Sequence, residues 1–121
     1  MRILLIDDDA NILGVYAEML RTAGYEVVEA SNGKEGVRLY KDAPFDLVVT
    51  DLLMPEKDGL EVVIELRRDF PKVKIITLSA GNAYGHSSLE TSLALGAART
   101  LRKPFKEDQL LEAVREVLES K

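Results

Sequence analysis

Carboxylates, a hydroxyl and an ammonium stand directly after short apolar runs in this chain of 121 residues. Three aspartates, Asp7–Asp9, follow "ILLI"; Asp51 follows "DLVVT", Ser79 follows "IITL", and Lys103 follows "TLR". Clustered carboxylates repel one another, and a divalent cation that prefers oxygen ligands relieves that repulsion. Mg²⁺ suits such a cluster because it takes few carboxylates, keeps waters and bridges to phosphate oxygens. A carboxylate can also act as a nucleophile toward phosphorus, with metal and ammonium balancing the charge of the transferring group.

The elements that must bring these residues together are five short β-rich runs that alternate with stretches of helical spacing. The expected strands are Ile3–Ile6, Glu26–Glu29, Leu47–Thr50, Lys74–Leu78 and Thr100–Arg102. Such alternation predicts an α/β domain with a parallel sheet and helices on both faces. Parallel sheets bind ligands at the carboxyl ends of their strands, which is where the candidate residues fall.

The stretches between the strands predict five helices. Asn32 and Asp58 are expected N-caps of the second and third, and Gly24 and Gly96 are expected stops of the first and fourth. The expected apolar face of the first helix comprises Ile12, Tyr16, Met19, Leu20 and Ala23. The fourth is expected to hold Leu89, Leu93 and Leu95, and the fifth to follow Pro104 with Leu110, Leu111, Val114, Val117 and Leu118.

Length and composition limit the possible classes of protein. One domain over residues 1–121 is expected, with 46% hydrophobic residues to build its core. The absence of cysteine excludes disulfides and zinc–thiolate sites and fits a reducing cytoplasm, the expected location. The first apolar run is too short for a signal peptide or membrane span. With a net charge of −5 and no Lys/Arg cluster, direct nucleic-acid binding is not expected.

Each candidate residue also has an ordinary structural interpretation. Asp9 is expected to be no more than a helix N-cap. Asp51 alone would be a loop acid, Ser79 could cap a turn, and Lys103 could be a solvated surface residue. The functional interpretation is favoured because these residue types all fall at the carboxyl ends of predicted neighbouring strands.

With these residues in place, the chain resembles a bacterial two-component response-regulator receiver domain, of the CheY-like kind. The resemblance is carried by "LLIDDD", "DLVVTDLLMPEKDG", "ITLSA" and "RKPF", with "SNGKEGV" and "LALGA" in support, and it covers essentially the whole chain. It implies a doubly wound, five-stranded parallel sheet of order 2-1-3-4-5 with five helices, a flavodoxin-like three-layer sandwich.

The resemblance also implies a role for each matching residue. Asp51 would be the phosphoacceptor and a ligand of Mg²⁺. Asp7 and Asp8 would hold the same ion, Asp8 directly and Asp7 through water, and the backbone carbonyl of Leu53 would supply a further oxygen.

Two further positions would contact the phosphoryl group. Ser79 would bond one of its oxygens, and Lys103 would pair with it, next to a peptide bond to Pro104 that is often cis in the family. Thr100 departs from the pattern, because the family usually has Tyr or Phe there; Ser79 and Thr100 are therefore the switch candidates.

The implied partners are a sensor histidine kinase or a histidine phosphotransfer protein as phosphoryl donor. The output surface would be helix 4, strand 5 and helix 5, which is also the candidate surface for a homodimer. The downstream effector protein or fused output domain is not identified. The function implied is a signalling switch that promotes its own phosphorylation and dephosphorylation, not a turnover enzyme.

Three other functions fit the sequence less well. A haloacid-dehalogenase-type phosphotransferase needs a second aspartate two residues after the nucleophile, where this chain has Leu53. A flavodoxin-like cofactor binder needs a phosphate loop rich in Gly, Ser or Thr after the first strand, where this chain has Asp7–Asp9. A degenerate receiver that only binds proteins would have lost Asp51, the acidic pair Asp7 and Asp8, or Lys103, and all of these are present.

Overall fold

A single sheet of five parallel strands forms the centre of the molecule. The computed structural model describes residues 1–52, 54, 58–79, 93 and 95–120. The strands lie in the spatial order β2-β1-β3-β4-β5. Their bounds are β1 Arg2–Ile6, β2 Glu26–Ala30, β3 Leu47–Asp51, β4 Ile75–Ser79 and β5 Arg99–Arg102. The predicted α/β class and the strand order 2-1-3-4-5 are confirmed.

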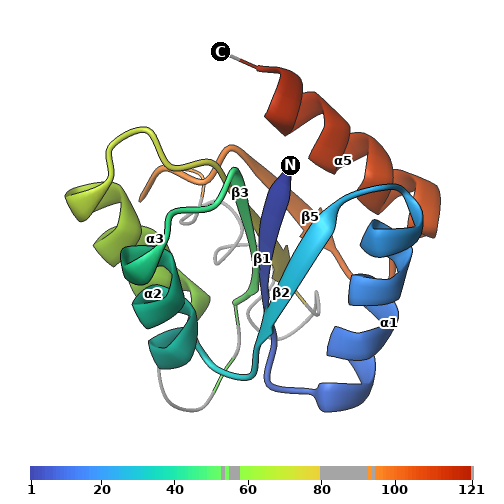
Figure 1. The fold of residues 1–121 in the computed structure, drawn as a ribbon, viewed down its shortest axis with the longest axis horizontal. Coiled ribbons are helices and arrows are strands. Elements are labelled where there is room, and N and C mark those ends of the chain that lie inside the picture. Colours follow the sequence, from blue (N-terminus) through green and yellow to red (C-terminus); the bar gives the residue numbers. More distant parts are fainter. Residues whose placement is uncertain (53, 55–57, 80–92, 94, 121) are drawn as a thin grey trace.

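Helices cover both faces of the sheet, so the molecule has three layers. The helices in the described residues are α1 Ala10–Thr22, α2 Gly33–Asp42, α3 Gly59–Asp69 and α5 Glu107–Glu119. Helices α1 and α5 lie on one face, and α2 and α3 lie on the other (Figure 1). Of the predicted helix between β4 and β5, only Leu93 and Leu95 are described as helical, and the rest, with Leu89, lies outside the described residues. Among the described helices, none has the length and apolar character of a membrane span.

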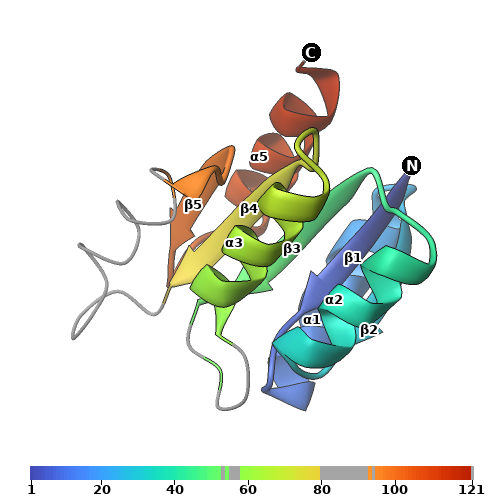
Figure 2. The same cartoon turned by 90° about the vertical axis from the view of Figure 1, so that its left-hand side faces the viewer.

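The strand register brings the carboxyl ends of the strands to one edge of the sheet. Ile6 pairs with Thr50 between β1 and β3, and Asp51 pairs with Leu78 between β3 and β4. Figure 2 shows the arrowheads of β1, β3 and β4 pointing toward the same end of the molecule. Residues that follow these positions therefore meet in space although they lie far apart in the sequence.

Polar side chains cap three of the helices where the sequence predicted caps. Asp9 accepts hydrogen bonds from the first amides of α1, Asn32 from the amide of Glu35, and Asp58 from that of Glu61. Each cap satisfies an amide that has no partner within its helix. The predicted stop at Gly24 is confirmed by its φ of +102°, a conformation that glycine adopts without steric penalty.

The core consists of two clusters, one on each face of the sheet. The buried residues of α1 are Leu13, Ala17 and Leu20. The prediction that Ile12 and Ala23 face the core was wrong: Ile12 is only partly buried and Ala23 is exposed. The buried stripe is rotated by about one residue, because the helix lies between the sheet and α5 and rests on both. Tyr16 and Met19 consequently lie at its border, packed against the core but partly exposed.

Candidate functional site

The carboxylates that the sequence predicted to converge form an acidic cluster of Asp7, Asp8 and Asp51. One carboxylate oxygen of each lies within 4.8 Å of the others. Asp51 ends β3 and Asp7 follows β1, so the pairing of these two strands places them side by side. Asp7 is 1% and Asp51 7% exposed, whereas Asp8 is exposed to solvent. The acidic cluster therefore consists of two buried carboxylates, Asp7 and Asp51, and one carboxylate, Asp8, that faces solvent.

Backbone amides fix the two buried carboxylates. Asp7 accepts a hydrogen bond of 3.0 Å from the amide of Asp9, and its own amide donates to the carbonyl of Ala30. Asp51 accepts a hydrogen bond of 3.0 Å from the amide of Leu52 through Oδ1. Since Oδ1 makes this contact, Oδ2 is the less engaged oxygen of the Asp51 carboxylate.

Lys103 points its ammonium group at the acidic cluster from the end of β5. Its Nζ lies 3.5 Å from Oδ2 of Asp7 and 3.5 Å from Oδ1 of Asp51, and its side chain is 17% exposed. Its amide donates a hydrogen bond of 2.6 Å to the carbonyl of Ser79, which ties the residue to the end of β4. The peptide bond between Lys103 and Pro104 is cis, as the resemblance implied.

Ser79 and Thr100 occupy the places in the sheet that their sequence positions predicted. Ser79 is the last residue of β4 and is 3% exposed. It lies one residue beyond the partner of Asp51 in the register of β3 and β4, hence at the same edge. Thr100 lies in β5 opposite Thr77 and is partly buried. Leu53, whose backbone carbonyl was expected to bind the metal, lies outside the described residues.

The electrostatics of the site raise the pKa of Asp51 and keep Lys103 positively charged. Burial is the largest effect on Asp51 and, together with the charge of Asp7, it raises the pKa of Asp51 to about 6 against the opposing effect of Lys103. Burial lowers the pKa of Lys103, but the charges of Asp51 and Asp7 outweigh that effect and raise its pKa overall. The ammonium is therefore held as a cation, while the carboxylate is costly to ionise until further positive charge arrives.

The donor set of the acidic cluster fits a hard divalent cation. All three side chains offer carboxylate oxygens, the ligands that Mg²⁺ and Ca²⁺ prefer, and one lies open to solvent. Asp7 already accepts bonds from an amide and from Lys103, so the exposed Asp8 and the Oδ2 of Asp51 are the oxygens best placed to ligate directly.

Two residues beside the site were not predicted from the sequence. The ring of Tyr16 lies 5.9 Å from the ammonium of Lys103, and no motif pointed to it, because the side of a helix that meets a site depends on packing. Gly59 begins α3 against the backbone after the acidic cluster. A Cβ added to it would meet the carbonyl oxygen of Asp51 and lie 2.7 Å from Cα of Leu52. The sequence signal was the "DG" pair that the predicted cap Asp58 forms with Gly59.

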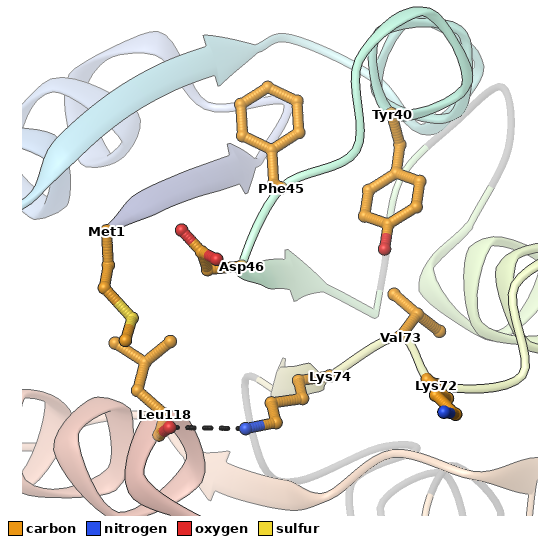
Figure 3. Close-up of a pocket in the computed structure, with 8 residues that line it drawn as sticks. All are labelled: Met1, Tyr40, Phe45, Asp46, Lys72, Val73, Lys74 and Leu118. Carbon is orange, nitrogen blue, oxygen red and sulfur yellow. Dashed lines mark hydrogen bonds between the residues drawn. The ribbon is translucent and has the colours of Figure 1, made fainter.

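A second concave region lies at the opposite end of the sheet, where the strands begin (Figure 3). Its volume is about 230 Å³, below the usual size of a ligand pocket. Asp46 accepts a hydrogen bond from the amide of Arg2, and Lys74 donates to the carbonyls of Leu118 and Ser120. These polar groups serve the fold, since they hold β1 to β3 and cap the C-terminal end of α5.

Comparison with known proteins places this arrangement among signalling domains. Residues 3–115 match the family model described as "Response regulator receiver domain". The chain is 34% identical to the chemotaxis protein CheY of Thermotoga maritima, over 96% of each chain. It also resembles the crystal structure of the response regulator TrrA of Thermotoga maritima in complex with Mg²⁺–BeF, with a TM-score of 0.86 and 39% identity, covering 96% of this chain and 97% of that one.

Some relatives are much longer proteins. The chain is 35% identical to the transcriptional regulatory protein GlrR of Escherichia coli over 97% of its own length, but it spans only 26% of GlrR. The similarity to such regulators therefore concerns one domain of them.

Proposed function

Because this chain belongs to the response regulator receiver domain family, we propose that Asp51 is its phosphoacceptor and that Lys103 and Ser79 contact the transferred phosphoryl group. A receiver domain takes a phosphoryl group in a two-component signalling system, so a sensor kinase or phosphotransfer protein is the implied class of donor. The observation that carries the assignment is the position of Asp51, at a strand end, within reach of two carboxylates and one ammonium.

The chemistry that the residues support is a direct displacement at phosphorus. A carboxylate oxygen of Asp51 attacks, and the bond from phosphorus to the nitrogen or oxygen of the donor breaks, with its electron pair leaving on the donor. The ammonium of Lys103 faces the incoming group and balances its negative charge. The hydroxyl of Ser79 is proposed to bond a phosphoryl oxygen once the group is in place.

Asp7, Asp8 and Asp51 are proposed to hold Mg²⁺, with Asp8 a direct ligand, Asp7 a ligand through water, and the carbonyl of Leu53 a further donor. When bound, Mg²⁺ would supply positive charge to the phosphoryl oxygens. The oxygen donor set supports this choice, as does the crystallisation of the related TrrA with Mg²⁺–BeF.

The phosphorylated domain is proposed to act as a switch and not as a turnover enzyme. Its output would run from Ser79 to the surface of helix 4, β5 and α5, which is also the proposed surface for a homodimer. Thr100 lies on β5 within that surface, two strands from the phosphoacceptor. The downstream partner, a separate effector or a fused output domain, and a cytoplasmic location belong to the same proposal.

Intact-protein mass after incubation with acetyl phosphate tests the assignment directly. The wild-type protein is expected to gain one phosphoryl group only when Mg²⁺ is present, and Asp51→Asn is expected to gain none. Asp42→Asn, which removes an exposed carboxylate on α2, serves as the matched control and should behave as wild type. A folded wild-type protein that gains no mass would show that the domain is a receiver-shaped binding module instead.

A further inference from the structure

An aromatic pair stands beside the ammonium of the site. Tyr16 of α1 and Phe105, two residues after Lys103, stack with ring centroids 5.3 Å apart and an angle of 30° between their planes. Both pack against the core cluster between the sheet, α1 and α5, and both remain partly exposed. The Nζ of Lys103 lies over the ring of Tyr16, 5.9 Å from its centroid. The ammonium therefore has an aromatic neighbour in addition to its two carboxylates.

The carboxylates alone hold this ammonium only loosely. Its distances of 3.5 Å to Asp7 and to Asp51 exceed the usual length of about 2.7–2.9 Å for a charge-assisted hydrogen bond. By contrast, the surface pair of Lys41 and Glu65 lies at 2.7 Å. A cation over an aromatic face within about 6 Å gains a further attraction, which grows as water is excluded. The ring of Tyr16 supplies that attraction where the carboxylates are distant.

Electrostatic coupling between the tyrosine and the site agrees with this geometry. Burial raises the pKa of Tyr16, Lys103 lowers it, and Asp7 and Asp51 raise it further, with a net rise. The hydroxyl is thus within electrostatic reach of all three charged groups. The face of the ring is what meets the cation, because Nζ of Lys103 lies over it.

We propose that Tyr16 is a positioning residue for phosphoryl transfer: its ring, backed by Phe105, holds the ammonium of Lys103 between Asp7 and Asp51. This inference rests on the proposed function, in which Asp51 accepts the phosphoryl group and Lys103 contacts it. It assigns to α1 a part in the reaction beyond its place in the core. The ordinary alternative is that Tyr16 only fills space at the border of the core.

Substitutions that separate the ring from the hydroxyl test the proposal. The rate constant of phosphorylation by acetyl phosphate is measured by intact mass at saturating Mg²⁺. Tyr16→Phe keeps the ring and should stay near the wild-type rate, whereas Tyr16→Leu should lower the rate constant about two- to fivefold. Tyr25→Leu is the matched control, because Tyr25 packs against the same core cluster and the loop that carries it precedes β2, at the other end of the sheet. It should leave the rate unchanged.

A double-mutant cycle distinguishes positioning from packing. If the ring acts through the ammonium, Tyr16→Leu should have no further effect in a Lys103→Met background. The same fractional loss in both backgrounds would overturn the proposal, as would a Tyr16→Phe rate as low as that of Tyr16→Leu. If Lys103→Met takes up no phosphoryl group, the affinity for Mg²⁺, measured by isothermal titration calorimetry, distinguishes the two possibilities. If Tyr16 positions Lys103, Tyr16→Leu should lower the phosphorylation rate and leave the affinity for Mg²⁺ within about twofold of wild type. A parallel loss of phosphorylation rate and Mg²⁺ affinity would contradict the proposal.

The outcomes also separate this inference from the proposed function. A wild-type protein that gains no phosphoryl group removes the function and the inference together. Normal uptake by the wild type, with equal rates for Tyr16→Leu and Tyr25→Leu, removes only the role of Tyr16.

Discussion

Replacing Asp51 by asparagine should stabilise the fold at neutral pH while it abolishes phosphorylation. The residue is 7% exposed, and its pKa is raised from 3.8 to about 6, chiefly by burial and also by Asp7, against the opposing effects of Lys103 and the amide of Leu52. An acid whose pKa is higher in the folded state binds more protons there than when unfolded. Its contribution to stability is therefore complete below about pH 4 and is lost as pH rises through about 6.

The magnitude follows from the same shift. A rise from 3.8 to about 6 corresponds to about 3 kcal/mol of folding free energy that ionised Asp51 costs above pH 6. Asparagine has nearly the same shape and does not ionise. The free energy of unfolding of Asp51→Asn should thus exceed that of wild type by up to about 3 kcal/mol at pH 7.5, and the difference should vanish near pH 4.

Urea unfolding followed by circular dichroism, at several pH values with EDTA present, measures this difference. Asp42→Asn corrects for the general loss of one negative charge from a chain of net charge −5. Added Mg²⁺ should narrow the difference at pH 7.5, because an ion that binds the folded wild type more tightly stabilises it more. Equal stabilities of wild type and Asp51→Asn at pH 7.5, or a difference that does not shrink on acidification, would refute the reasoning.

Two further substitutions test the supports of the site and the fold. Gly59→Ala should lower the free energy of unfolding by about 1–3 kcal/mol, because the added methyl group meets backbone atoms that cannot move away. Gly14→Ala in α1 is the control, since a methyl group there has open space and should raise the free energy of unfolding by up to about 1 kcal/mol. Parallel urea titrations compare the two variants, and a Gly59→Ala protein more stable than wild type would contradict the contact. Lys74→Met should lower the free energy of unfolding by about 1 kcal/mol, because two carbonyls at the end of α5 lose their hydrogen-bond donor, and it should leave the phosphorylation rate unchanged. Lys72→Met, on the same loop, is the control. Equal losses of stability in the two variants would mean that the contact of Lys74 contributes nothing.

Much of the fold could be predicted because its signals are local. The caps Asp9, Asn32 and Asp58 each satisfy amides within three residues of themselves, so the sequence alone places the starts of α1, α2 and α3. The apolar runs place the strands for a similar reason, since a strand covered on both faces reads as a continuous apolar run. The buried face of α1 was misplaced by about one residue, because its orientation depends on the sheet and α5 together.

The positions of the site residues were likewise predictable, but their physical state was not. That Asp7, Asp51 and Lys103 meet follows from parallel strands that end at one edge. The sequence suggested that repulsion among carboxylates would make ionisation costly, whereas burial is the larger cause for Asp51. Burial depends on how the layers close over the site, and the approach of Tyr16 depends on the same packing, so neither has a signature in the spacing of residues.

The loose hold on the ammonium suits a site that must change partners. A lysine bonded closely to one carboxylate would have to lose a strong interaction before it could turn to an arriving phosphoryl group. Lys103 instead lies at 3.5 Å from both Asp7 and Asp51, so neither contact is costly to give up. On the role proposed for Tyr16, the attraction of its ring would persist through such a shift, since a cation can move across an aromatic face without breaking a specific bond. If Asp51 is the phosphoacceptor, as proposed, an ammonium held in this way can remain in the site before and after the transfer, while the group that it neutralises changes.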